Sequence, residues 1–283
     1  MTSILSIQSA VAYGHAGNSS AVFPLQRLGI ETWPVYTVMF SNHTGYGSWR
    51  GPMIPPSDVR EIVLGIDERG ALAECDAVLS GYLGAPEVGE VILEAAALVK
   101  QRNPRALYCC DPVMGDIGRG FFTRPGVPEF FRDHVVKAAD VVTPNLFEVM
   151  FLTGRTDITT MDELLEAAEE LRAVGPRTVL VTSAVFPGEQ VMRMVALNDD
   201  GAWQVETPLI DQAFVGSGDL TTAVFVARLL SGLPLDQVLS LTGDSVYGIL
   251  KATQESGSSE LAIVAAQEEL VNPSHTHAAT RLR

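Results

Sequence analysis

The sequence predicts an α/β protein of three layers, in which a mostly parallel central sheet is flanked by helices on both faces. Short apolar runs alternate with longer amphipathic runs of helical period, which is typical of parallel strands joined by crossover helices. A hairpin pattern near residues 191–205 predicts an antiparallel edge to this sheet. No repeat or linker divides the 283 residues, so we expect one domain over 1–283.

The first 70 residues predict two strands and two helices. A short apolar strand over 4–7 leads through a glycine-containing loop to a helix that ends at Gly29, and residues 32–40 are extended. The run Pro55-Pro56-Ser57 predicts the start of a second helix, with Ser57 as its N-cap.

The middle of the chain continues this alternation. Four apolar runs have the length of buried strands: 77–79, 106–110, 141–142 and 178–181. Helical patterns that begin near Pro86, Leu146 and Thr160 separate or follow them. Thr160 with Glu163 has the spacing of a capping box, which predicts where the third of these helices starts.

The C-terminal third predicts the hairpin and three helices. Residues 191–197 and 203–205 form its strands, with the turn at Asp199-Asp200-Gly201. An amphipathic helix then carries apolar residues at helical spacing, and we expect further helices over roughly 235–254 and 258–270 before a polar tail.

Composition and charge exclude several classes of protein. The net charge of −15 without a basic run argues against nucleic acid or an anionic membrane as the main partner. No apolar stretch reaches the ~20 residues of a membrane span, and the N-terminus has no signal-peptide pattern. Cys75 and the adjacent Cys109 and Cys110 suit reduced, buried thiols better than disulfides or a zinc site. We therefore expect a cytoplasmic enzyme.

A glycine-rich stretch at 214–219 (FVGSGD) opens the amphipathic helix. Gly216 and Gly218 allow backbone amides to converge where the helix begins, and there the free N–H groups and the helix dipole favour an anion. Asp219 would repel such an anion unless a cation or a transferable proton is involved. The pattern predicts either a capped glycine turn or an anion site with an acid–base group beside it.

Polar residues follow the predicted parallel strands at their carboxyl ends, where ligands bind in open sheets of this kind. They are Ser9, Tyr82, Asp111, Thr143, Asn145, Glu148, Thr182 and Ser183. Asp111 and Glu148 offer the oxygen ligands that Mg²⁺ prefers. Together with the anion site and Asp219, these residues predict phosphoryl transfer.

Two large kinase classes are excluded by their motifs. The chain has three lysines, Lys100, Lys137 and Lys251, and none lies in a glycine-rich loop. Neither the GxxxxGK[ST] pattern nor the DFG and HRD patterns occur. A phosphoryl-transfer enzyme with this sequence must use another fold.

The stretch at 214–219 resembles the GxGD motif of the ribokinase-like superfamily. Other segments, in order along the chain, resemble the pyridoxal kinases: 9–18 (SAVAYGHAGN), 40–46 (FSNHTGY), 79–83 (LSGYL), 110–115 (CDPVMG) and 143–148 (TPNLFE). The GHAGN and SNHTGY loops are specific to that family. Some bacterial members have Thr-Gln at the position of 44–45 and Lys-His at that of 182–183, so this chain lacks a lysine charge that they bring to the phosphates.

This resemblance implies a transferase of vitamin B6 salvage that moves a phosphoryl group from ATP, with Mg²⁺, to the 5′-hydroxymethyl group of pyridoxal. Asp219 would deprotonate that hydroxyl, and Gly216, Ser217 and Gly218 would form the anion hole. The pyridoxal ring would contact Ser9, His43, Thr44, Gly45 and Tyr82. ATP and its cations would contact Asp111, Thr143, Asn145, Glu148, Thr182, Ser183 and Phe214, with Asp111 and Glu148 on the metal.

Several alternatives stay open. A hydroxymethylpyrimidine kinase, or one enzyme acting on both rings, would have a similar pocket. A third hypothesis is a non-catalytic protein that binds B6 vitamers. The presence of Asp219 and of both glycines of the motif argues against it. The resemblance also implies a homodimer. It leaves open pyridoxine and pyridoxamine as substrates, a requirement for a monovalent cation such as K⁺, and the motion of a lid near 115–125.

Overall fold

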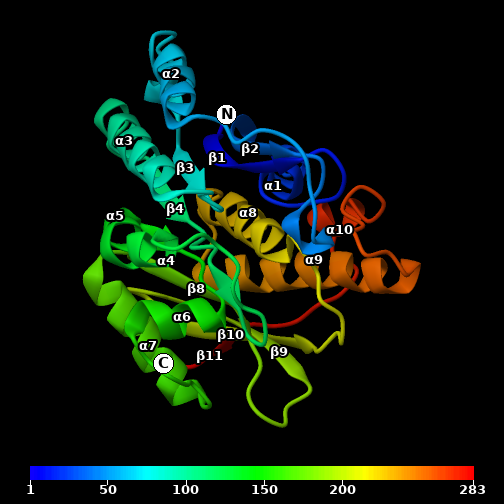
Figure 1. Ribbon diagram of the computed structural model, residues 1–283. Helices are drawn as coiled ribbons and strands as arrows, with labels where there is room; N and C mark the ends of the chain where they lie inside the picture. The colour runs from blue at the N-terminus through cyan, green and yellow to red at the C-terminus, as the bar shows by residue number, and fades with distance from the viewer.

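The computed structural model describes residues 1–283 and has a nine-stranded sheet at its centre, ordered β11-β10-β9-β8-β7-β4-β3-β1-β2 (Figure 1). The strands are β1 Ser3–Val11, β2 Glu31–Phe40, β3 Ala77–Ser80, β4 Leu107–Cys110, β7 Val141–Val142, β8 Thr178–Ala184, β9 Val191–Asn198, β10 Gly201–Pro208 and β11 Thr280–Arg281. The run from β2 to β8 is parallel, and β9, β10 and β11 add an antiparallel edge. The predicted fold class is confirmed, because ten helices accompany this sheet and cover both faces.

The helices are α1 Asn18–Arg27, α2 Pro56–Asp67, α3 Pro86–Arg102, α4 Val127–Phe130, α5 Val136–Ala138, α6 Leu146–Thr153, α7 Met161–Val174, α8 Ser217–Leu230, α9 Leu235–Ser256 and α10 Glu268–Val271. A cluster of 41 buried residues unites one face of the sheet with α2, α3, α6 and α7. A second cluster of 26 buried residues unites the other face with α1, α8 and α9. Alternate residues of each central strand enter different clusters, as Cys109 and Cys110 of β4 do, so both faces of these strands are apolar.

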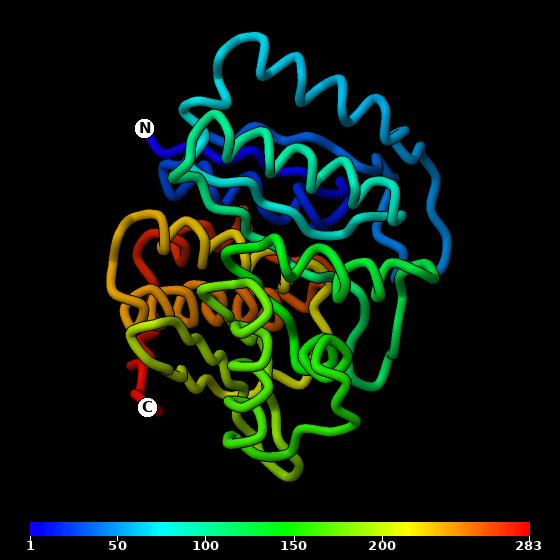
Figure 2. Tube along the Cα trace, turned by 90° about the vertical axis from the view of Figure 1, so that its left-hand side faces the viewer, coloured from blue at the N-terminus to red at the C-terminus, as the bar shows by residue number.

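Both views place the first hundred residues (blue to cyan) at one end of the sheet and residues 130–210 (green to yellow) at the other (Figures 1 and 2). Between these ends run α8 and α9, which pack on each other. Because β1, β3, β4, β7 and β8 are parallel neighbours, the loops that follow them emerge along one edge of the sheet.

Most of the predicted elements are confirmed, including the capping box of Thr160 and Glu163 and the β9–β10 hairpin. The predicted cap of α2 is wrong: Pro55 is the N-cap and Ser57 lies inside the first turn, without a side-chain capping bond. A short antiparallel pair that the sequence pattern did not predict, β5 Gly115–Asp116 and β6 Gly120–Phe121, follows β4.

The C-terminal segment differs most from its prediction. The helix expected over 258–270 is reduced to α10, because residues 258–267 form bends and turns in which Leu261 and Ile263 are buried. The polar tail is also structured, since Trp203 and Gln204 pair with β11. None of the helices is both long enough and apolar enough to span a membrane.

Candidate active site

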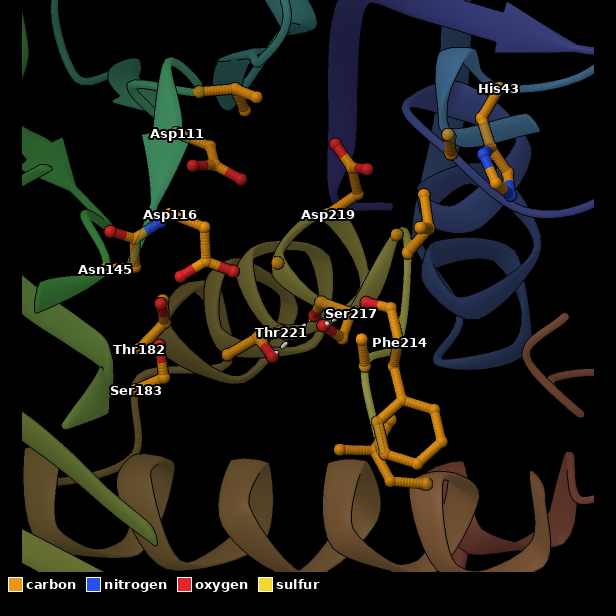
Figure 3. A pocket seen from close by; sticks show the side chains of 18 of the residues that line it. His43, Asp111, Asp116, Asn145, Thr182, Ser183, Phe214, Ser217, Asp219 and Thr221 are labelled. Atoms are coloured by element: carbon orange, nitrogen blue, oxygen red, sulfur yellow. Dashed lines mark hydrogen bonds between the residues drawn. The ribbon is translucent and has the colours of Figure 1, made fainter. Parts of the chain in front are cut away.

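A cavity of about 600 Å³ opens at the carboxyl ends of the parallel strands, beside the N-terminus of α8. The predicted site residues that line it are Ser9, His43, Thr44, Gly45, Tyr82, Asp111, Asn145, Glu148, Thr182, Ser183, Phe214, Gly216, Ser217, Gly218 and Asp219. Figure 3 shows Asp111 and Asn145 on one side, His43 on the other, and Asp219 between them above α8. Segments more than 200 residues apart in sequence therefore meet in this cavity.

Thr143 is the predicted site residue that does not line the cavity. Its hydroxyl is buried and lies 2.7 Å from that of Thr222, whose hydroxyl in turn lies 3.4 Å from Oδ2 of Asp111. The structure thus places Thr143 behind Asp111, as the end of a short hydrogen-bonded chain.

The turn before α8 has a conformation that requires glycine. Gly216 is its N-cap and has a φ of 83°, and a Cβ there would lie 2.0 Å from the carbonyl oxygen of His15. The Ser217 hydroxyl donates to the carbonyl of Phe214 at 2.8 Å and so braces the turn. The amides of Gly218 and Asp219 belong to the first turn of α8, where N–H groups lack intrahelical acceptors and favour an anion.

Asp219 is held at this helix start by the loop after β1. The N–H of Gly17 donates to its Oδ2 at 2.8 Å. Gly17 itself packs so closely on Ser9 that a Cβ would lie 2.3 Å from the Ser9 hydroxyl oxygen. Burial raises the pKa of Asp219 to about 6, against the opposing effect of the Gly17 N–H. An aspartate with this pKa is ionised at neutral pH and can accept a proton.

Asp111 and Glu148 bring two more carboxyl groups to the floor of the cavity. Burial and the negative charges of Glu148 and Asp219 raise the pKa of Asp111 well above its usual range. Burial also raises the pKa of Glu148 to about 8. Glu148 completes the capping box of α6, because its carboxylate accepts the N–H group of Asn145 at 2.9 Å. Its other oxygen accepts the N–H group of Met114, also at 2.9 Å.

These carboxyl groups do not form a closed metal site. No group of three or more His, Cys, Asp and Glu side chains in the chain has the arrangement of a metal cage. Mg²⁺ nevertheless suits a site with few protein ligands, because it keeps several waters and shares its coordination with phosphate oxygens. Asp111 has the freer carboxylate, whereas both oxygens of Glu148 already accept backbone N–H groups.

Two groups of cavity residues were missed by sequence reasoning. One is on the β5–β6 hairpin, where Asp116 and Arg119 line the cavity; Arg119 is the one lysine or arginine among all the lining residues. The other consists of Met192, Met194, Pro208, Ile210, Val246 and Leu250, contributed by β9, β10, the following loop and α9. We call this second group the apolar wall, and the group Ser9, Gly17, His43, Thr44, Gly45 and Tyr82 the polar wall. Sequence periodicity could not reveal the apolar wall, because its residues have the spacing of ordinary core positions.

Comparison with known proteins gives a consistent result. Residues 63–263 match the family model described as phosphomethylpyrimidine kinase. A curated relative, pyridoxal kinase PdxY of Rubrobacter xylanophilus, is 56% identical over 95% of this chain and 94% of its own. Pyridoxal kinase of Leishmania donovani in complex with ADP and ginkgotoxin has a TM-score of 0.93 at 29% identity, and its complex with ADP and pyridoxamine has 0.93 at 28%; both comparisons cover 100% of both chains. The chain belongs to the phosphomethylpyrimidine kinase family and, within it, to the pyridoxal kinases.

Proposed function

We propose that this chain, acting as one kinase domain over residues 1–283, transfers the γ-phosphoryl group of ATP to the 5′-hydroxymethyl group of pyridoxal. The observation that carries the proposal is the position of Asp219: its carboxylate is fixed by the Gly17 N–H, in the first turn of a helix whose free amides face the same cavity. The relatives named pyridoxal kinase, and the related enzyme that binds ADP with pyridoxamine, support the choice of substrates.

In the proposed reaction, the hydroxymethyl oxygen attacks the γ-phosphorus as its proton passes to the Asp219 carboxylate. The new O–P bond forms as the bond between the γ-phosphorus and the bridging oxygen breaks, and ADP leaves with that electron pair. The backbone N–H groups of Gly216 to Gly218 stabilise the negative charge of the transferred group by donating hydrogen bonds to its oxygens. Asp219 is suited to its role because a base with a pKa of about 6 is ionised at neutral pH yet still basic.

The nucleotide would lie over α8, with its phosphates toward Asn145, Thr182 and Ser183 and its base against the apolar wall. Asp111 would hold Mg²⁺ directly and Glu148 would hold it through water. When bound, this ion neutralises phosphate charge. Among the lysine and arginine side chains, only that of Arg119 lines the cavity and can do the same.

The pyridoxal ring would lie against the polar wall. Ser9 and Thr44 offer hydroxyl groups for its polar substituents, and His43 and Tyr82 offer ring faces. Burial raises the pKa of Tyr82, so its phenol stays protonated and can donate a hydrogen bond. In this proposed arrangement the acceptor hydroxymethyl group would point toward Asp219, between the ring and the phosphates.

The direct test is ATP consumption by the purified protein with pyridoxal and Mg²⁺, compared with the Asp219→Asn variant. We expect the substitution to lower kcat by about 10²–10⁴-fold, the usual contribution of a general base. An inactive native protein, or a variant that keeps full activity, would contradict the proposal. The same assay in K⁺, Na⁺ and tetramethylammonium salts measures any requirement for a monovalent cation.

A second function has support from the family model, whose description names phosphomethylpyrimidine kinase. We therefore include hydroxymethylpyrimidine as an alternative or additional acceptor. Competition among pyridoxal, pyridoxine, pyridoxamine and hydroxymethylpyrimidine ranks these substrates by kcat/KM. Tight binding of pyridoxal 5′-phosphate without any turnover would instead favour the non-catalytic alternative.

We also propose that the protein is a cytoplasmic homodimer with neither nucleic acid nor membrane as a partner. The net charge of −15 opposes binding to polyanions and supports the last part. Light scattering coupled to size-exclusion chromatography measures the oligomeric state, and a mass of one chain would exclude the dimer.

A further inference from the structure

Glu260 connects the C-terminal part of the chain to two loops of the polar wall. It is 9% exposed and lies in the turn region that replaces the predicted helix after α9. Its Oε1 lies 3.0 Å from Nε2 of His43 and accepts the Tyr46 hydroxyl at 2.7 Å. Its Oε2 accepts the backbone N–H of His15 at 2.9 Å. One carboxylate therefore holds the loop after β1 and the loop after β2.

The turn that carries Glu260 is itself held in place. The Ser258 hydroxyl donates to the Glu260 carbonyl at 2.8 Å and accepts the Glu260 N–H at 3.0 Å. The N–H of Ala262 donates to the Thr253 hydroxyl of α9 at 2.9 Å. Gln212, in the loop before the glycine-rich turn, donates to the Ser258 carbonyl at 3.1 Å. Glu260 is thus anchored to a long helix before it contacts the site loops.

The contacts of Glu260 determine the orientation of His43. A carboxylate only accepts hydrogen bonds, so Nε2 of His43 must carry a proton and donate to it. The ring stacks on Tyr46 with centroids 4.6 Å apart, and its Nδ1 lies so close to Gly45 that a Cβ there would be 2.9 Å away. Glu260, Tyr46 and Gly45 therefore hold the ring from three sides, and Thr44 and Gly45 follow it into the cavity wall.

The loop after β1 extends the influence of Glu260 toward the reacting groups. Gly14 approaches the carboxylate so closely that a Cβ would lie 2.2 Å from its Oε2. Three residues later, Gly17 donates to Asp219. The same loop contacts the turn before α8 through the carbonyl of His15, which packs against Gly216. A shift of this loop would move the surroundings of both the acceptor and Asp219.

We infer that Glu260 is a positioning residue for the acceptor substrate, which it affects by holding His43 and the loops at 13–17 and 43–46. It does not line the cavity and acts through these groups. The inference rests on the proposed function for its kinetic part only. Glu260 lies outside every motif of the sequence, yet it supports the binding of the vitamer ring.

The test compares Glu260→Gln with Glu255→Gln, a control on the last turns of α9 whose side chain is 63% exposed and pairs with Lys251. A glutamine side chain has nearly the shape of the Glu260 carboxylate. Its NH₂ group, however, cannot accept a hydrogen bond, so one of the bonds from His15, His43 and Tyr46 is lost. We expect KM for pyridoxal to rise about tenfold, the effect of one lost hydrogen bond to a charged group. We expect KM for ATP to change by less than about twofold, since no contact of Glu260 reaches the apolar wall. Tyr46→Phe, which removes one of the three donors at a side chain that is 46% exposed, should raise KM for pyridoxal by a smaller factor in the same direction.

A double-mutant cycle and hydrogen exchange separate positioning from a general structural role. In a His43→Ala background, Glu260→Gln should change KM for pyridoxal less than in the native background, because the route through His43 is gone and only the contact with the loop at 13–17 remains. The backbone amides of residues 13–17 and 43–46 should exchange hydrogen faster in the Glu260→Gln variant than in the native protein. Their exchange rates should be unchanged in the Glu255→Gln variant. Equal increases in both KM values, or native exchange in the Glu260→Gln variant, would overturn the inference. The exchange measurement does not depend on activity, so it tests the inference even if the native protein does not phosphorylate pyridoxal. Inactivity toward pyridoxal would contradict only the proposed function.

Discussion

The two walls of the cavity are built in different ways. The polar wall is fixed by hydrogen bonds to charged groups, as in the contacts of Gly17 with Asp219 and of His43 with Glu260. The apolar wall has aliphatic and methionine side chains, which hold a ligand by contact and can adjust their shape. The difference suggests a division of work: fixed geometry where a bond is made, and adaptable contact where the ligand is only held.

Apart from the loss of Asp219 itself, the largest effect should come from disturbing the backbone shared by the polar wall and the glycine-rich turn. Gly216→Ala would press a Cβ against the His15 carbonyl and strain a residue with a φ of 83°. We expect kcat/KM to fall by about 10²–10³-fold, as when a donor to a developing anion is displaced. The control is Gly257→Ala, which has a φ of 68° but open space around its Cβ. Similar losses in both variants would show that backbone strain, and not the packing on His15, is responsible.

The pH dependence of kcat/KM tests whether the ionised Asp219, which the polar wall holds in place, is required for the reaction. Its pKa is raised from 3.8 to about 6, so the free enzyme loses the basic form as the pH falls below about 6. We expect kcat/KM for pyridoxal to decrease about tenfold for each pH unit below that value. Steady-state rates between pH 5 and 8 measure this. A profile that stays flat down to pH 5 would exclude Asp219 as the group that must be ionised.

The same pKa predicts that Asp219 lowers stability. A carboxyl group with a raised pKa favours the protonated folded state, so its destabilising effect is complete above about pH 6 and vanishes below the unfolded value of 3.8. Asp219→Asn should therefore stabilise the fold at pH 7.5 by at most about 3 kcal/mol. Denaturant unfolding at pH 7.5 and pH 4 measures the change, which should shrink at the lower pH. An equal effect at both pH values would point to packing and not to charge.

The smallest effect is expected on the apolar wall. Met192→Ala removes part of the contact surface of a half-buried side chain on β9. We expect KM for ATP to rise about fivefold, in line with the loss of roughly 1 kcal/mol of apolar contact. KM for pyridoxal should stay near its native value. A larger effect on pyridoxal than on ATP would mean that the two walls are assigned to the wrong ligands.

Local patterns were sufficient for much of the fold. The capping box at Thr160 and the Asp199–Gly201 turn were read correctly because each depends on neighbours within a few residues. The C-terminal segment was not, because its apolar residues suit a helix as well as the buried turns that Leu261 and Ile263 form. Thr143 was placed at the right strand end, but only packing puts its hydroxyl against Thr222 and away from the cavity.

The sequence by itself determined the layers of the fold, the family, and the residues at the carboxyl ends of the parallel strands, because periodicity, turn chemistry and motifs are local properties. Only the tertiary structure decided what those residues face. Glu260 contacts His15 and His43, which lie 245 and 217 positions away, and Met192 of β9 lines the same cavity as Leu250 of α9. Such contacts depend on how distant segments pack, and no spacing along the chain records them.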